Sequence, residues 1–215
     1  MAKGGLSVSN QGEKPKSTAD AILDAAIDRF VADGFDGSSM DSIALAAGVA
    51  KGTLYYHYKS KEGIVDAALK RYTRRVERVF KAIEADPSLG VLDRLIAMTS
   101  GTIQVNIETF SKLHRMKGID IHKRTNDIIL LSFTPYYARA IAAGNAAGLW
   151  SAPDPARDAE ILIAASLVLL DPEEGSDLMP ARVEALITLM ERGFAMAPGT
   201  LAPVREAFMQ MFSPA

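Results

Sequence analysis

The sequence predicts an all-α protein, and two observations about its apolar residues carry that prediction. In successive segments of the 215-residue chain they recur three and four positions apart, which is the period of a helix buried along one face. Nowhere do apolar and polar residues alternate over a longer stretch, as they would in a half-buried strand. Hydrophobic residues make up 48% and charged residues 23% of the chain, which is typical of a globular protein.

The amino-acid composition and the apolar runs of the sequence exclude cysteine-based sites and a membrane-spanning segment. The sequence contains no cysteine, so disulfide bonds and thiolate metal ligands are excluded. The longest apolar run, residues 161–170, is too short to cross a bilayer. Residues 1–15 also lack the apolar core of a signal peptide. We therefore expect a cytoplasmic protein that makes no contact with a membrane.

The N-terminal part of the chain predicts an arm and one helix. Residues 1–16 are polar and rich in glycine and serine, which is typical of a flexible segment. A helix is expected over residues 17–32, with Ser17 or Thr18 as its N-cap. Gly34 supplies the left-handed conformation with which many helices end.

Two very short helices are expected next. Ser38 or Ser39 can cap the first, and Ser38 followed by Asp41 three residues later resembles a capping box. Residues 48–49 end this helix, and the second runs over about 51–57. A glycine-containing turn of three to four residues between two short helices is the helix-turn-helix pattern.

The remaining segments also predict helices. One runs from about residue 60 to residue 83 and ends before Pro87, because the residue before a proline avoids the helical region. Others are expected at 92–110, 127–147, 156–170 and 179–195. Pro135 lies inside the second of these four, so we expect a kink or a break there.

A series of motifs at fixed spacing lies between residues 22 and 69: Gly34-Phe35, Ile43-Ala44, Ala47-Gly48-Val49, Lys51-Gly52-Thr53-Leu54-Tyr55 and Tyr58-Lys59-Ser60-Lys61-Glu62. This segment resembles the DNA-binding domain of the tetracycline-repressor (TetR) family. The resemblance implies a flexible arm at 1–16, a helix-turn-helix DNA-binding domain at 17–62, and a larger helical ligand-binding and dimerisation domain at 63–215. It also implies a regulator, most often a repressor, that binds palindromic operator DNA as a homodimer and is released by a small hydrophobic or aromatic effector.

The expected DNA contacts centre on the second short helix, whose first residues would meet base edges in the major groove. Lys51 can reach a guanine edge or a phosphate, and Gly52 lets the backbone approach closely. Leu54 should point into the core, and of two adjacent tyrosines at least one should be exposed. The full expected set is Ser38, Ser39, Lys51, Gly52, Thr53, Tyr55, Tyr56, His57 and Lys61, the last at a phosphate site formed by the amides that begin the next helix.

Two features qualify the DNA-binding prediction. The family usually has serine or threonine before Lys51, and Ala50 stands there instead, so this helix loses a cap worth about 1 kcal/mol. The N-terminal part of the chain has only a small positive net charge, because residues 1–75 contain 11 Lys and Arg against 9 Asp and Glu. The arm carries Lys3, Lys14 and Lys16, which could reach the minor groove or make no contact at all.

For the C-terminal domain the resemblance implies an effector pocket and a dimer interface. The residues expected to line the pocket are Met98, Thr102, Phe110, Met116, Phe133, Tyr136 and Tyr137, although such residues at helical spacing also suit a plain core. The dimer is expected to form through helices 156–170 and 179–195, the first of which is apolar on nearly every side. The alternative is that this helix is the central core helix of a monomer.

Other functions have weaker support in the sequence. His114 and His122 flank Asp120, but two exposed histidines explain them better than a metal site. No nucleophile elbow, zinc-protease motif or dinucleotide-binding motif is present, so we expect neither an enzyme nor a cofactor. An architectural DNA-binding protein without an effector is the remaining alternative, and the large apolar C-terminal domain argues against it.

Overall fold

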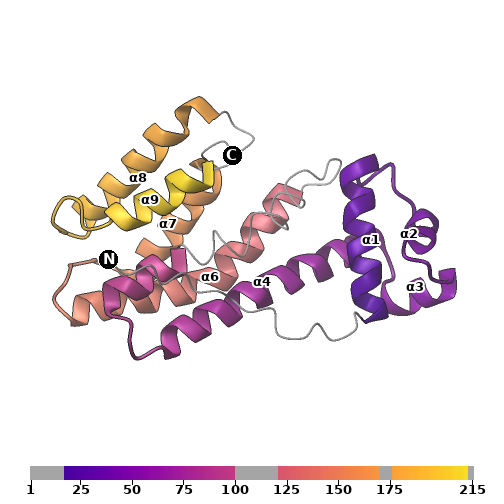
Figure 1. Cartoon of the computed structure of the whole chain (residues 1–215), viewed down its shortest axis with the longest axis horizontal. Coiled ribbons are helices and arrows are strands. Elements are labelled where there is room, and N and C mark those ends of the chain that lie inside the picture. Colours follow the sequence, from indigo (N-terminus) through magenta and orange to yellow (C-terminus); the bar gives the residue numbers. More distant parts are fainter. Residues whose placement is uncertain (1–16, 100–120, 170–175, 213–215) are drawn as a thin grey trace. The chain divides into compact units, whose positions relative to one another are not determined.

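The computed structural model describes residues 17–99, 121–169 and 176–212, and these are helical, with no strand among them (Figure 1). The predicted all-α fold is confirmed. The elements are α1 (Thr18–Asp33), α2 (Met40–Ala46), α3 (Lys51–His57), α4 (Lys61–Ala85), α6 (Ile121–Ala146), α7 (Pro155–Leu169), the 3₁₀ turn η2 (Ser176–Leu178), α8 (Met179–Gly193) and α9 (Ala202–Phe212). A further helical stretch covers residues 91–99.

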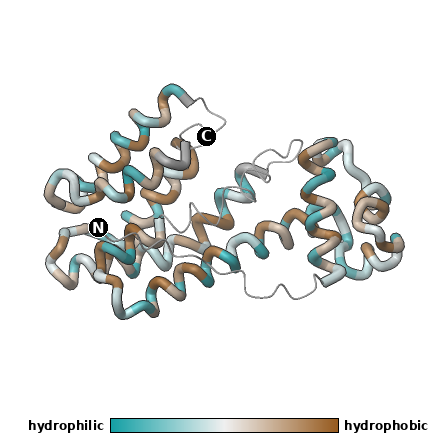
Figure 2. Tube along the Cα trace, viewed as in Figure 1, coloured by the Kyte–Doolittle hydropathy of each residue, from teal (hydrophilic) through white to brown (hydrophobic). Residues whose placement is uncertain are grey.

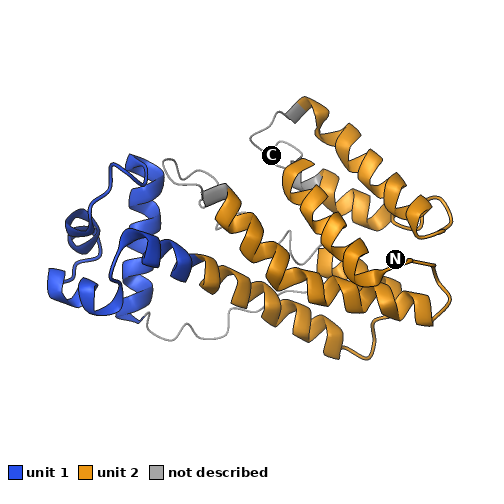
Figure 3. Ribbon diagram, turned by 180° about the vertical axis from the view of Figure 1, so that it is seen from behind, with its two compact units in different colours: residues 1–68 blue, residues 69–215 orange. Residues whose placement is uncertain are grey.

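The chain divides into two compact units, residues 1–68 and residues 69–215 (Figure 3). The division falls inside α4, whose first eight residues belong to the first unit. The boundary proposed from the sequence, 62/63, lies near the start of the same helix. The first unit holds α1, α2 and α3, and the second holds the helices from α6 to α9.

The first unit is built around α1. Ser17 caps this helix, because its hydroxyl oxygen accepts from the backbone N–H of Asp20 at 3.1 Å. Gly34 ends it at φ 79°, a conformation that glycine adopts without strain. Phe30 is fully buried, and its ring lies 5.2 Å from that of Phe35. The other fully buried side chains of this unit are Ile22, Ala26, Ile43, Leu54, Ile64 and Val65.

The predicted capping box of α2 was wrong by one residue. The N-cap is Ser39, whose hydroxyl accepts from the N–H of Ser42, while the hydroxyl of Ser42 accepts from the N–H of Ser39, both at 3.0 Å. Ser38 is buried instead, and its hydroxyl donates to the carbonyl of Gly34 at 2.8 Å. Because that hydroxyl is occupied by the preceding turn, the helix begins one residue later than Ser38 would allow.

Pro135 does not break the helix in which it lies. Helix α6 is continuous from Ile121 to Ala146, so of the two expected outcomes, a kink or a break, the break is wrong. Proline removes the hydrogen bond to the carbonyl four residues earlier, that of Leu131. Pro135 and Leu131 are both exposed, so water can solvate the carbonyl that is released.

The second unit is held together at the corner between α6 and α7. The indole N–H of Trp150 donates to the carbonyl of Ile141 at 2.8 Å, and Asn145 exchanges two 2.8 Å hydrogen bonds with the backbone of Ala152. The ring of Trp150 lies against Gly144, where a Cβ atom would come within 1.8 Å of it. Gly144 is therefore the residue that lets Trp150 close this corner.

Helix α9 has no counterpart among the predicted elements. Its start is capped by a side chain from α8, because Glu191 accepts from the N–H of Gly199 at 2.9 Å and from that of Leu201 at 2.8 Å. Glu191 is buried and uses both carboxylate oxygens in these bonds. A cap supplied by a residue in the preceding helix leaves no local pattern in the sequence.

Helix α4 is amphipathic, and hydrophobic and hydrophilic residues follow one another along it (Figure 2). Its buried apolar positions are Ile64, Val65, Ala68, Leu69, Tyr72, Val76 and Phe80, and Thr73 is buried as well. Within the three described ranges no helix is long and apolar enough to span a membrane. The same ranges hold no group of three or more side chains placed to bind a metal ion.

Candidate nucleic-acid interface

One buried side chain determines which residues of α3 are exposed. Leu54 is 0% exposed and fastens α3 to the core of the first unit, as predicted. The other residues of the helix, Lys51, Gly52, Thr53, Tyr55, Tyr56 and His57, are exposed. Tyr56 is 78% exposed and Tyr55 is 37% exposed, which confirms that at least one of the two tyrosines faces solvent.

No side chain caps the start of α3. Ala50 is the N-cap and makes no side-chain hydrogen bond, as expected from its side chain. At Gly52 a Cβ atom would meet nothing within 4 Å, so the backbone there is open to a large ligand. The turn that precedes α3 passes through Gly48 at φ 66°, which positions the helix relative to α2.

Lys51 is held by a carboxylate from α2. Its ammonium nitrogen lies 2.8 Å from Oδ1 and 2.9 Å from Oδ2 of Asp41, and 5.9 Å from the centre of the Tyr55 ring. The hydrogen bond to Asp41, and then the charge of that carboxylate, raise the pKa of Lys51. Asp41 was not among the expected site residues, because a residue ten positions away on another helix leaves no sequence pattern.

Lys61 also has a partner within the first unit. Its ammonium donates to the carbonyl oxygen of Phe35 at 2.6 Å and lies 4.4 Å from the centre of the Phe35 ring. Nearby, Lys59 donates to the carbonyl of Tyr55 at 2.7 Å. One of the three N–H groups of Lys61 is used in this way, so two can still meet a phosphate.

The two serines expected at the interface lie in different environments. Ser39 is exposed and caps α2, at the end of that helix near Asp41. Ser38 is buried with its hydroxyl bonded inside the unit, so the expectation that it touches DNA does not fit this arrangement. The exposed side of α3 and the start of α2 therefore make up the candidate interface.

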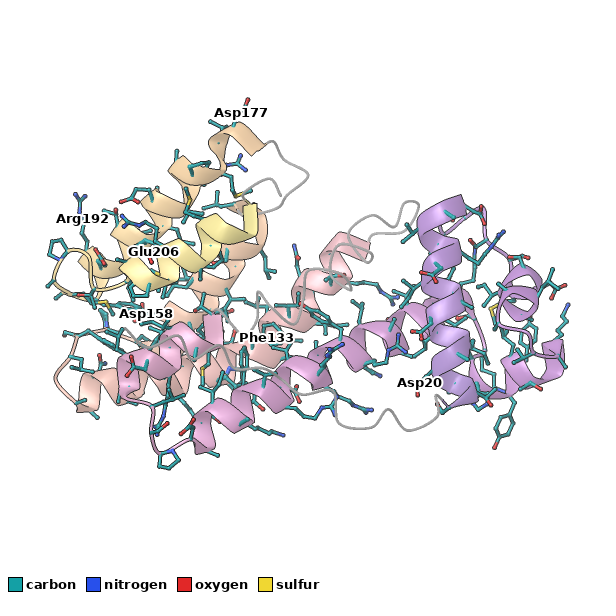
Figure 4. All side chains as sticks on the ribbon, viewed as in Figure 1. Asp20, Phe133, Asp158, Asp177, Arg192 and Glu206 are labelled. Atoms are coloured by element: carbon teal, nitrogen blue, oxygen red, sulfur yellow. The ribbon has the colours of Figure 1, made fainter. Side chains whose placement is uncertain are left out.

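Among the residues expected to line an effector pocket, those that the structure describes belong to a core. Phe133 of α6, labelled in Figure 4, and Tyr136 are buried, and Tyr137 is half-buried. Their rings surround Phe80 of α4, with centres 5.2, 5.2 and 5.7 Å away. Phe80 was missed, because its sequence position predicts no more than a core residue.

The structure describes only part of the rest of the expected pocket. Met98 is buried in the helical stretch 91–99. Thr102, Phe110, Met116 and His114 lie outside the described residues, as does the side chain of His122. Among the described side chains of α6, the buried atoms Thr125 Oγ1, Asn126 Oδ1 and Thr134 Oγ1 have no hydrogen-bond partner.

Helices α7 and α8 expose apolar side chains. On α7, Ile161 and Val168 are exposed, and on α8, Leu189 is 63% exposed. Ala181 and Ala185 precede Leu189 at intervals of four residues and are exposed as well, so they form one stripe along α8. Between α8 and α9 lies a cleft of about 230 Å³ whose charged lining includes Arg192 (Figure 4).

The family model that matches the chain falls within the first unit. Residues 22–68 match the family model described as "Bacterial regulatory proteins, tetR family". Over 117 residues the chain is 30% identical to TtgW of Pseudomonas putida, an uncharacterised HTH-type transcriptional regulator, covering 51% of this chain and 84% of TtgW. Over 51 residues it is 41% identical to IcaR of Staphylococcus aureus, the negative transcriptional regulator of the biofilm operon icaADBC, covering 24% of this chain and 27% of IcaR.

One solved structure extends the resemblance over most of the chain. FadR of Bacillus subtilis, a transcriptional regulator in complex with stearoyl-CoA, superposes with a TM-score of 0.58 at 18% identity. The match covers 90% of this chain and 97% of FadR. At that level of identity the likeness concerns the fold.

Proposed function

Because the chain belongs to the tetR family of bacterial regulatory proteins, whose members are transcription regulators and not enzymes, we propose that it is a repressor released by a small hydrophobic or aromatic effector. In this proposal a homodimer binds a palindromic operator in the cytoplasm. Members of the family bind operator DNA as dimers and respond to small-molecule ligands.

The exposed face of α3 is the observation that carries the proposal. A recognition helix must present polar groups to base edges while its other side is fixed to a rigid support. Here Leu54 supplies the fixed side, and Lys51 and Thr53 supply polar groups at the start of the helix. The open backbone at Gly52 allows close approach to DNA. Tyr55, Tyr56 and His57 can reach phosphates at the edge of the groove.

The apolar stripes of α7 and α8 support a homodimer. A monomer would leave Ile161, Val168 and Leu189 in water, whereas a two-fold interface would bury them against the same residues of a second copy. A dimer also presents two copies of α3, which a palindromic operator requires. The alternative of a monomer with α7 as a central core helix does not account for these exposed residues.

Side chains inside the second unit support the proposal that the protein binds an effector. IcaR is a negative regulator and FadR holds stearoyl-CoA, so this fold is compatible with repression and with a ligand that carries a long apolar chain. The aromatic rings around Phe80 would contact such a ligand, and the unpaired hydroxyls of Thr125 and Thr134 could bond its polar group.

The test is a selection of duplexes from a randomised library by the full-length protein, followed by binding titrations on the selected sequence. We expect a palindromic sequence, with two half-sites one helical turn apart protected from cleavage. Replacing Lys51 with alanine should weaken binding about tenfold or more, whereas Lys81→Ala, an exposed cation in the second unit, should leave it unchanged. No preference for any sequence over unrelated DNA would overturn the proposal.

A further inference from the structure

An acidic side chain stands at the end of the candidate interface where a DNA-binding surface is expected to be basic. Asp41 is in the first turn of α2, and 63% of its side chain is exposed. Its partner Lys51 is the first residue of α3, and 61% of its side chain is exposed. A solvent-exposed ion pair of this kind contributes little to stability, so folding alone does not explain its place.

The pair has a defined geometry. Both carboxylate oxygens of Asp41 lie within 2.9 Å of the Lys51 ammonium, and the ring of Tyr55 lies 5.9 Å from that ammonium on α3. Lys51 is thereby held at one place instead of moving freely on its four-carbon stem. Each carboxylate oxygen has a further acceptor site, and the ammonium has further N–H groups, so both can bond a third partner.

The pair matches one base pair in the major groove. A G·C pair presents the acceptors O6 and N7 on guanine beside the N4 amino donor on cytosine. An ammonium donates to the first two, and a carboxylate accepts from the third. An A·T pair instead places its one donor, the adenine N6 amino group, between the acceptors N7 and O4, and the thymine methyl group lies beside O4. It therefore offers the ammonium no two adjacent acceptors with a donor beside them.

The charge of Asp41 also acts on DNA that is not the operator. Phosphates carry the binding energy that is independent of sequence, and an exposed carboxylate near them weakens it. A negative charge beside the recognition helix therefore lowers affinity for unrelated DNA more than affinity for a sequence that satisfies it. The Asp41 carboxylate therefore increases specificity for the operator, although it lowers the affinity for DNA in general.

We propose that Asp41 is a specificity-determining residue, which acts with Lys51 to select a G·C base pair at one position of each operator half-site. This inference rests on the proposed function, because it assumes that α3 enters the major groove. It assigns to α2 a direct contact with a cytosine and gives Asp41 a second role in positioning Lys51.

The experiment compares the wild-type protein with Asp41→Ala and Asp41→Asn on the duplex that the wild type selects. Asp36→Asn is the matched control, because Asp36 is an exposed acidic residue of the same unit outside α2 and α3. Each protein is titrated with this duplex, with duplexes in which each G·C pair is exchanged for A·T, and with unrelated DNA. A thermal melt of each variant establishes that it is folded.

For the wild type we expect one G·C pair per half-site whose exchange weakens binding about tenfold. Asp41→Ala should reduce that ratio to less than about threefold, and both Asp41 variants should bind unrelated DNA more tightly, while Asp36→Asn behaves as the wild type does. A duplex whose cytosine is replaced by 2-pyrimidinone, which lacks the amino group, should lose affinity for the wild type and not for Asp41→Ala.

The outcomes separate this inference from the function on which it rests. If Asp41→Ala selects the same sequence with the same ratios at every position, Asp41 does not determine specificity, although the protein is still an operator-binding regulator. The 2-pyrimidinone duplex tests the same point without any variant, so equal wild-type affinity for it also overturns the inference. If the wild type itself selects no sequence, it is the proposed function that fails.

Discussion

The ammonium of Lys61 at the start of α4 donates to the carbonyl oxygen of Phe35 at 2.6 Å and lies 4.4 Å from the centre of the Phe35 ring. The contact ties α4 to the loop between α1 and α2 within the first unit. It gives one lysine two roles, because an ammonium that is held by a carbonyl still has two N–H groups for a phosphate.

Replacing Lys61 with alanine should therefore change both stability and DNA binding. Loss of the charged hydrogen bond and of the contact with the ring should lower the free energy of unfolding by about 1–2 kcal/mol. Affinity should fall about equally for all duplexes, and the slope of log K against log salt should flatten by roughly one unit. A lower melting temperature with an unchanged slope would show that Lys61 is a structural tether and touches no phosphate.

Replacing Leu189 with aspartate should dissociate the proposed dimer. The side chain is 63% exposed on the stripe of α8, so an aspartate there is harmless to the monomer but would be buried unpaired in a two-fold interface. Light scattering across a dilution series measures the effect. Leu131→Asp is the control, because Leu131 is an equally apolar and 77% exposed residue on α6. Equal behaviour of the two variants would count against α8 as the interface.

Replacing Gly144 with alanine should destabilise the second unit. The added methyl group would come within 1.8 Å of the Trp150 ring, and relieving that overlap costs about 1–3 kcal/mol. For a chain of this size each kcal/mol lowers the melting temperature by roughly 2–4 °C. Gly193→Ala is the matched control, since a Cβ atom there meets nothing within 4 Å. A melting temperature as high as that of the control would mean that the ring can shift at no cost.

Replacing Glu191 with alanine should loosen the start of α9. Two backbone N–H groups, those of Gly199 and Leu201, would lose their acceptor, at about 1–3 kcal/mol for a buried donor left unpaired. Amide hydrogen exchange should quicken over residues 199–205 more than elsewhere. Glu160→Ala, a change to a glutamate of α7 whose ion pair is with Arg157 of the same helix, should leave these amides as they are.

A small hydrophobic or aromatic compound that raises the melting temperature of the protein should also weaken its hold on the operator. Binding to the native state alone stabilises it by about 2.7 kcal/mol at a concentration one hundred times Kd. Linkage then requires the operator to weaken that compound's affinity by the same factor, commonly worth about 1–3 kcal/mol. Titrations with and without saturating operator measure this factor. Equal affinities in both would show that the compound's site is not the sensor.

The helix-turn-helix could be predicted because its determinants are local. The period of the apolar residues of α1 and the glycines that end α1 and α2 each act within a few residues of themselves. Leu54 and its exposed neighbours follow from the period of a single helix. The missing cap at Ala50 is likewise visible in one residue.

Contacts between residues far apart in sequence were decided only by the tertiary structure. The pairing of Asp41 with Lys51, and of Lys61 with Phe35, depends on where two helices and a loop meet, which no local period records. Helix α9 was missed because Glu191 caps it from α8. The capping box of α2 moved by one residue because Ser38 bonds backward to α1's last turn. Sequence alone thus determined the described elements other than α9, whereas packing determined the partners of each charged or capping side chain, because those partners come together only when the helices have docked.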